Sequence, residues 1–405
     1  MSFFRSRWVD APTHAGELEP TALPRGFRAA GVAAGIKPEG LDVGVLASDS
    51  PETVSAARFT LNARVGAPVV VSREADLQGL RAVAANSGCS NVGDGRRGLE
   101  TAVAMQAAAA GKLGLEAAQV GVASTGVIGT ELPRDAVVGG VQAACDELGL
   151  DSAGFSEAIL TTDSGPKRAC VAVHLRSGTV RLAAQAKGAG MISPRFATMF
   201  CFVETDAALS AETLDLLTGV CVKRSFDRIS VDGQLSTSDS VFALASGASG
   251  VRVEAESEEE LRLGEALDAL LRQLALEIVA DGEGAARVGR IVVRGRADAV
   301  EPVARSVANS PLVKASLHGG DANLGRVLQA AGQAWPPGEP FVADLEIEGR
   351  LLVSAGDVVE AAPSELASGS EIEYTLTMPG EGGETEVFFS DLSPEYARFN
   401  SAHTS

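Results

Sequence analysis

The sequence from Lys187 to Asp206 reads Lys-Gly-Ala-Gly-Met-Ile-Ser-Pro-Arg-Phe-Ala-Thr-Met-Phe-Cys-Phe-Val-Glu-Thr-Asp and lies near the middle of a 405-residue chain. Two glycines, Gly188 and Gly190, follow the charged Lys187 and allow the backbone to pass close to another group. An apolar run, predicted to be a strand, begins directly after Thr198.

Thr198 has two interpretations. A threonine before a buried strand is usually a strand residue, because a β-branched side chain suits the pleat. The small residue before it, the flexible glycines and the rigid strand after it also suit a self-activated nucleophile. Its hydroxyl would attack the preceding carbonyl, cut the chain at Ala197-Thr198 and free an α-amine that serves as the base for the same hydroxyl.

This segment resembles the cleavage signature Lys-Gly-x-Gly-Met-x-x-Pro-x-x-Ala-Thr-Met of the glutamate N-acetyltransferase (ornithine acetyltransferase) family, and every fixed position matches. The resemblance implies an α/β, mixed-sheet layered fold of the self-cleaving type. It also implies two chains after processing, an alpha chain of residues 1–197 and a beta chain of residues 198–405.

The composition of the chain argues against several classes of binding partner. The chain is 45% apolar and 21% charged, as expected for a globular protein. A net charge of −19 argues against nucleic acid and anionic membranes as partners. The five cysteines form no Cys-x-x-Cys pair and the four histidines lack metal-ligand spacing, which favours a reducing cytoplasm and no metal. No apolar run is long enough to cross a bilayer.

The apolar pattern predicts alternating strands and helices after a loose leader of about two dozen residues. Predicted strands cover residues 41–47, 69–72, 81–85, 120–123, 169–175, 179–186, 288–295, 341–346, 371–378 and 386–390. Predicted helices cover residues 98–115, 137–148, 211–217, 257–280 and 304–310.

A Ser-Thr-Gly-Val-Ile-Gly turn follows the predicted strand at residues 120–123. By itself it is more typical of a capped strand-to-helix turn than of an oxyanion hole. The same motif supplies the oxyanion hole of the resembled family, which implies that role for the Thr125 hydroxyl and the Gly126 N–H.

The resemblance also implies a set of substrate-binding residues. By themselves, a lysine at a strand end and a glutamate in a helix-end loop indicate only exposed polar positions, and a chain end is usually frayed. Together with Thr198, the family motifs implicate Thr161, Lys187, Glu283, Asn400 and Ser405.

The polar run at residues 232–240 and four departures from the family pattern also concern the predicted substrate site. The polar run at residues 232–240 has the oxygen groups of a hard-cation site but not the spacing of an EF-hand, so we interpret it as a hydrogen-bonded loop. The chain departs from the family pattern at four positions. The family commonly has Thr-Lys where this chain has Ala286-Arg287, and Pro and Trp where it has Ala322 and Leu324.

The implied reaction transfers the acetyl group of N2-acetyl-L-ornithine to L-glutamate through an acetyl-Thr198 intermediate, in arginine biosynthesis, without a cofactor. The sequence leaves open whether acetyl-CoA is also a donor. The family suggests alpha and beta chains assembled into a heterotetramer or larger complex. Three alternatives stay open: a paralogue with another acyl donor, an N-terminal-nucleophile amidase or aminopeptidase, and a binding protein without the chemistry.

Overall fold

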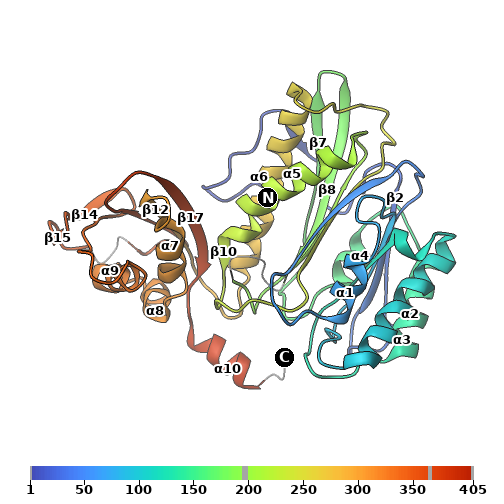
Figure 1. Cartoon of the computed structure of the whole chain (residues 1–405), viewed down its shortest axis with the longest axis horizontal. Helices are drawn as coiled ribbons and strands as arrows, with labels where there is room; N and C mark the ends of the chain where they lie inside the picture. The colour runs from blue at the N-terminus through green and yellow to red at the C-terminus, as the bar shows by residue number, and fades with distance from the viewer. Residues whose placement is uncertain (1, 194–198, 364–366, 403–405) are drawn as a thin grey trace.

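The computed structural model of the chain describes residues 2–193, 199–363 and 367–402. These residues form a larger lobe and a smaller lobe, the latter built mainly from residues after 287 (Figure 1). Ala197, Thr198 and Ser405, three positions of the predicted site, lie outside the described residues. So does the predicted cut between residues 197 and 198.

Within the described residues, the larger lobe contains two β-sheets. The first, in spatial order, consists of β1 (Ala15–Glu17), β7 (Lys167–Leu175), β8 (Gly178–Lys187), β9 (Phe200–Thr205), β11 (Ser240–Ala245) and β4 (Val54–Phe59). The second consists of β2 (Phe27–Val32), β3 (Val43–Ser48), β5 (Ala82–Asn86) and β6 (Val120–Ser124). Each sheet is mixed, because β9 pairs parallel with β11 and β5 pairs parallel with β6 while the other neighbours are antiparallel.

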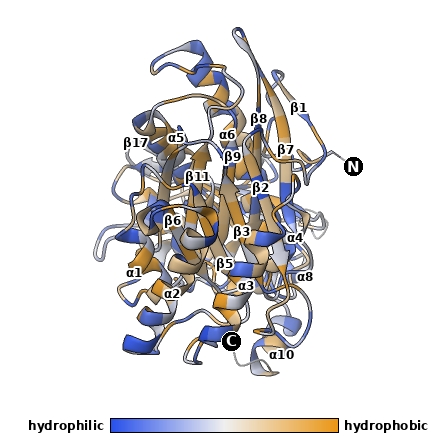
Figure 2. Ribbon diagram, turned by 90° about the vertical axis from the view of Figure 1, so that its right-hand side faces the viewer, coloured by the Kyte–Doolittle hydropathy of each residue, from blue (hydrophilic) through white to orange (hydrophobic). Residues whose placement is uncertain are grey.

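The two sheets face each other across an aromatic core. Phe202 of β9 and Phe242 of β11 stack with ring centroids 5.9 Å apart and pack with Phe27 and Leu46 from the other sheet. A Cβ on Gly121 of β6 would come within 2.7 Å of the Phe242 ring, so the sheets approach closely at that glycine. Hydrophobic residues accordingly run along the central strands, whereas hydrophilic residues are common on the outer helices (Figure 2).

Helices cover the outer face of each sheet and complete four layers. The helices of this lobe are α1 (Ala67–Arg73), α2 (Gly95–Leu113), α3 (Arg134–Asp146), α4 (Ala153–Ala158), α5 (Ala211–Arg224) and α6 (Glu258–Ala280), with short 3-10 turns at Ala117–Gln119 and Phe226–Arg228. Residues of α5 and α6 share a core with the first sheet, and residues of α2 and α3 share one with the second.

The ends of the long helices follow from local sequence. Ser257 caps α6 by accepting a hydrogen bond from Glu260 N–H, and three glutamates occupy the first turn near the positive end of the helix dipole. Helix α2 ends at Gly114, whose φ of +66° is the left-handed conformation that glycine adopts without strain. Both helices were predicted from the sequence.

The smaller lobe contains the third sheet of the described residues, with α7 (Val300–Ala308), α8 (Pro311–Gly319) and α9 (Leu324–Gln333). Its strands, in spatial order, are β10 (Ile229–Ser230), β17 (Gly382–Ser390), β12 (Val288–Arg296), β16 (Glu371–Thr377), β13 (Asp344–Ile347), β14 (Arg350–Ser354) and β15 (Asp357–Val358). Helix α10 (Pro394–Ala402) then leaves this lobe (Figure 1).

The layered α/β, mixed-sheet prediction is confirmed, but two local predictions are wrong. Residues 69–72 form part of helix α1, which starts with Pro68 in its first turn and buries Val69 and Val71. A short apolar run does not distinguish a buried helix from a strand. The leader is not loose, because β1 pairs with β7 and the side chains of Val9 and Leu23 are buried.

Candidate active site

A pocket of about 320 Å³ is lined by residues of the larger lobe and of helix α10, and it contains all the predicted oxyanion and substrate-binding residues that the structure describes. Thr125 and Gly126 come from the turn after β6, Thr161 from the loop before β7, and Lys187 from the end of β8. Glu283 in the turn after α6 and Asn400 of α10 complete the set of predicted residues that the structure describes. These six positions span 276 residues of sequence, from 125 to 400, and line one cavity.

The turn after β6 has the geometry of a donor site. Gly126 has a φ of +124°, and a Cβ there would lie 2.4 Å from the carbonyl carbon of Gly88, so only glycine fits. Among the described residues no backbone acceptor is found for the Gly126 N–H. The Thr125 N–H is bound to the Asn86 carbonyl at 3.0 Å, which fixes the turn and leaves the Thr125 hydroxyl facing Lys187.

Lys187 is buried and is surrounded by oxygen atoms. Its Nζ donates to Thr161 Oγ1 at 2.7 Å and lies 3.4 Å from Thr125 Oγ1 and 3.7 Å from Asp163 Oδ2. Burial lowers the pKa of Lys187, and the charge of Asp163 opposes that shift. Lys187 therefore links the candidate oxyanion turn to the candidate substrate loop, rather than lying in solvent.

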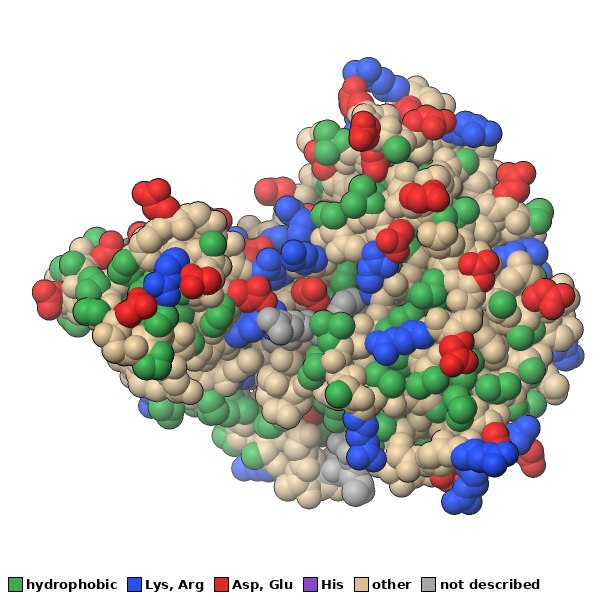
Figure 3. Space-filling view, viewed as in Figure 1, with side chains coloured by type: hydrophobic (Ala, Val, Ile, Leu, Met, Phe, Trp, Pro, Cys, Tyr) green, Lys and Arg blue, Asp and Glu red, His purple; other side chains and the backbone are tan. Residues whose placement is uncertain are grey.

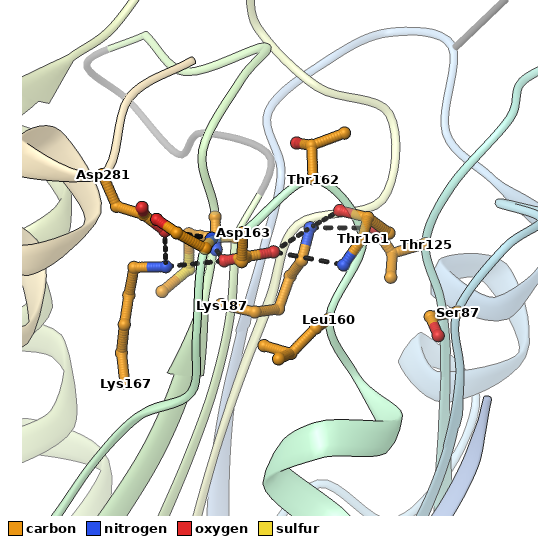
Figure 4. Close-up of polar contacts among 12 residues, drawn as sticks. Ser87, Thr125, Leu160, Thr161, Thr162, Asp163, Lys167, Lys187 and Asp281 are labelled. Carbon is orange, nitrogen blue, oxygen red and sulfur yellow. Dashed lines mark hydrogen bonds and ion pairs between the residues drawn. The ribbon is translucent and has the colours of Figure 1, made fainter. Parts of the chain in front are cut away.

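Asp163 organises this group of charges (Figure 4). It lies between Lys187 and Lys167, whose Nζ is 2.7 Å from Asp163 Oδ1, and it also accepts the Gly188 N–H at 2.6 Å. Burial would raise the pKa of Asp163, but the two lysines outweigh burial and hold it well below its usual range. Asp281 pairs with Lys167 at 2.6 Å on the far side.

Glu283 is held on three sides. Its two carboxylate oxygens accept from Thr162 Oγ1 at 2.9 Å and from Asn400 Nδ2 at 2.8 Å. A Cβ on Gly190 would lie 2.5 Å from Glu283 Oε1, so the second glycine of the central motif is what allows this carboxylate to approach the chain. The close approach expected at the motif glycines is thus found at Gly190.

The polar loop at residues 232–240 supports the segment around the predicted cut. Asp232 accepts the N–H groups of Met191 and Ile192 at 2.7 and 2.9 Å. The buried Asp239 accepts, at 3.1 Å, the N–H of Met199, the residue directly after the predicted nucleophile, and burial raises the pKa of Asp239. No group of three or more metal-ligating side chains is present among the residues described.

The four departures from the family pattern lie away from the cavity. None of Ala286, Arg287, Ala322 and Leu324 is among the described residues that line it. Arg287 Nη1 instead donates to the carbonyls of Leu317 and His318, which ties the start of β12 to α8. These four positions are therefore not part of the described lining of the pocket, and Arg287 makes its contacts within the smaller lobe.

Comparison with known proteins identifies the family. The model of the ArgJ family matches residues 28–405. The chain belongs to the ArgJ family.

Two relatives named arginine biosynthesis bifunctional protein ArgJ match nearly the whole chain. That of Symbiobacterium thermophilum is 40% identical over 391 residues, which is 94% of this chain and 97% of the relative. That of Rhodopirellula baltica is 39% identical over 406 residues, 96% of this chain and 99% of the relative. A crystal structure of ornithine acetyltransferase complexed with ornithine, from Mycobacterium tuberculosis, matches 46% of this chain and 99% of that chain at 35% identity and a TM-score of 0.41.

Several residues in or beside the pocket were not predicted from sequence. Asp163 and Lys167, which contact the pocket through Lys187 and its neighbours, stand four residues apart in a motif from which only Thr161 was selected. Tyr396, whose hydroxyl donates to Asp232 Oδ2 at 3.3 Å, and Lys37 carry no motif at all. The described part of the chain has no helix that is both long and apolar enough to cross a membrane.

Proposed function

We propose that this ArgJ-family protein is a self-cleaving acetyltransferase of arginine biosynthesis that moves the acetyl group of N2-acetyl-L-ornithine to L-glutamate through acetyl-Thr198. The observation that carries the proposal is the single pocket lined by Thr125, Gly126, Thr161 and Lys187 from the proposed alpha chain and by Glu283 and Asn400 from the proposed beta chain. Family membership and the names of the relatives support the same reaction.

The first step of the proposal is self-cleavage. The Thr198 hydroxyl attacks the carbonyl of Ala197, and hydrolysis of the resulting ester leaves residues 1–197 and residues 198–405 as two chains. The hydrogen bond from Met199 N–H to buried Asp239 and the pairing of Lys187 with Phe200 in adjacent strands support a fixed position for the chain just after the cut.

Acetyl transfer then proceeds in two half-reactions. The α-amine of Thr198 takes the hydroxyl proton as Oγ attacks the acetyl carbonyl, and the oxyanion accepts hydrogen bonds from the Thr125 hydroxyl and the Gly126 N–H. Each such donor contributes about 2.7–4 kcal/mol to stabilising the transition state in comparable sites. Ornithine leaves with the proton on its amine, and the amine of glutamate attacks the acetyl ester by the reverse steps.

Substrate orientation follows from the charges. Lys187 pairs with the α-carboxylate that both amino acids carry, beside Thr161. Glu283, fixed by Thr162 and Asn400, pairs with the side-chain ammonium of N-acetylornithine. Ser405 adds a terminal hydroxyl to the same pocket in this proposal. The nucleophile, base and oxyanion donors all belong to the chain, so the reaction needs no cofactor.

The proposal extends to a second donor, an assembly and a compartment. The shared description of the relatives as bifunctional supports acetyl-CoA as a second acetyl donor. The two chains would assemble as a heterotetramer or a larger complex. Five free cysteines, four of them buried, support a reducing cytoplasm.

Denaturing electrophoresis and a donor assay test the proposal. Wild type should give two fragments divided at Ala197-Thr198, and the Thr198→Ala variant should remain one chain. The cleaved protein is then supplied with N-acetylornithine or acetyl-CoA, with and without glutamate. An intact, inactive wild type contradicts the nucleophile, and deacetylation that ignores glutamate would identify a hydrolase instead.

A further inference from the structure

The pocket contains a second lysine, Lys37, which lies in the loop between β2 and β3. Its side chain is half-buried and its Nζ donates to the carbonyl of Leu160, directly before Thr161, at 3.1 Å. A Cβ on Gly88 would lie 2.8 Å from Lys37 Cγ, so the aliphatic part crosses the chain at Gly88. Since Gly88 also lies against Gly126, Lys37 is a neighbour of the candidate oxyanion turn.

Lys37 is the pocket cation with the fewest charge partners. The charged residues that line the pocket, within the described part of the chain, are Lys37, Lys187, Asp232 and Glu283. Lys187 has Asp163 at 3.7 Å, whereas no carboxylate of the described residues forms an ion pair with Lys37. The nearby Asp42 binds backbone instead, because its carboxylate accepts hydrogen bonds from the N–H groups of Ala34 and Ile36, each at 2.6 Å.

The other charged groups of the pocket are already engaged. Both Glu283 oxygens accept hydrogen bonds from Thr162 and Asn400, and Asp232 holds the backbone at Met191. Burial lowers the pKa of Lys37, while the charge of Asp42 opposes that shift. With Lys187 assigned to the α-carboxylate, a second carboxylate that entered the pocket would find its free counter-charge at Lys37.

The two half-reactions of the proposed function require such a counter-charge. N-acetylornithine and glutamate share an α-carboxylate and a reacting α-nitrogen, but one side chain ends in an ammonium and the other in a carboxylate. A glutamate side chain next to Glu283 would bring two negative charges together. Resting on the proposed function, we propose that Lys37 binds the side-chain carboxylate of the acceptor and makes the second half-reaction selective for an acidic amino acid.

The two half-reactions are measured separately to test this. Lys37→Met removes the charge but keeps an unbranched stem over Gly88. The rate at which N-acetylornithine acetylates the beta chain, measured by mass spectrometry, should change less than about twofold. The KM for glutamate should rise by about 10- to 100-fold, the range expected for a lost hydrogen bond to a charged group. The preference for glutamate over glutamine should fall by a similar factor.

Two matched variants serve as controls. Lys37→Arg keeps the positive charge and should keep most of the preference for glutamate. Lys112→Met makes the same chemical change at an exposed lysine, paired with Asp146 at 2.5 Å, and should leave both half-reactions unchanged.

Two outcomes would overturn the role of Lys37. One is an equal slowing of both half-reactions in Lys37→Met, which would mean that Lys37 only supports the loop at Leu160. The other is a wild-type enzyme that accepts glutamine as well as glutamate, a measurement that needs no variant. Failure of wild type to form any acetylated beta chain would contradict the proposed function itself, so the two failures are distinguishable.

Discussion

Replacing Asp163 by Asn should destabilise the protein strongly, because it leaves the buried Lys187 without its ion-pair partner and leaves Lys167 paired with Asp281 alone. The side chain of Asp163 is fully buried, and the side chains of Lys167 and Lys187 are only 5% and 2% exposed. Asn retains an oxygen for the Gly188 N–H, so the variant removes chiefly the charge. Breaking a buried pair by removing one partner costs about 3–5 kcal/mol.

Urea denaturation followed by circular dichroism measures the change in free energy of unfolding. The matched control is Asp146→Asn, which breaks the exposed pair with Lys112 and should cost about 0–1 kcal/mol. A second variant, Asp163→Asn with Lys187→Met, removes the uncompensated charge and should recover part of the loss. A loss at Asp163 no greater than that at Asp146 would refute the reasoning.

The same carboxylate should give a pH signature. The pKa of Asp163 is held below its usual range in the folded protein. The Asp163 carboxylate therefore contributes fully to the free energy of unfolding above the unfolded pKa of about 3.9, and this contribution is lost as the pH falls below that value. Asp163→Asn should lack this acid-dependent part. The variant should also lower the pKa of Lys187 further, since the Asp163 charge opposes the effect of burial there, and should move the alkaline limb of activity to lower pH.

Three other perturbations test separate parts of the molecule. Thr125→Ala should reduce the kcat of already cleaved protein by about 10²- to 10³-fold, with an unchanged KM. Asn400→Ala removes a hydrogen bond to the Glu283 carboxylate and should raise the KM for N-acetylornithine by about tenfold, with little effect on glutamate. Burial raises the pKa of Glu204 to about 8, so wild-type stability should fall as the pH rises from about 4.3 to 8, while Glu204→Gln should lack that fall in urea midpoints.

Much of the fold could be predicted where the sequence carries a local signal. The alanine-rich α2 and the capped α6 have periodicity and end signals of their own, and their predicted bounds differ by only a few residues from those observed. Strands β4 and β11 were missed. They pair with each other although residues 54–59 and 240–245 are far apart in sequence, and every residue of β11 is buried. Such strands lack the alternation that marks a strand with one exposed face.

The candidate site was predictable to the extent that its residues belong to motifs. Thr125, Lys187 and Glu283 were selected because the surrounding residues form recognisable patterns, and all three line the pocket. The reason that Lys187 is buried could not be read from the sequence, because it depends on a charge network between the loop at Asp163 and the strand ends at Lys167 and Lys187. Spacing along the chain does not report which charges neutralise one another in space.

Lys37 lines the pocket but belongs to no sequence motif, so it could not be selected from the sequence. An isolated lysine in a loop is usually exposed. Here the loop is shaped by Asp42, which is fully buried and accepts three backbone N–H groups, including that of Lys37 at 2.9 Å. The Asp42 carbonyl also accepts the N–H of Ser87, beside the Gly88 that Lys37 crosses. A buried carboxylate that binds only backbone thus directs a lysine into the pocket, and it does so without a pattern that sequence inspection detects.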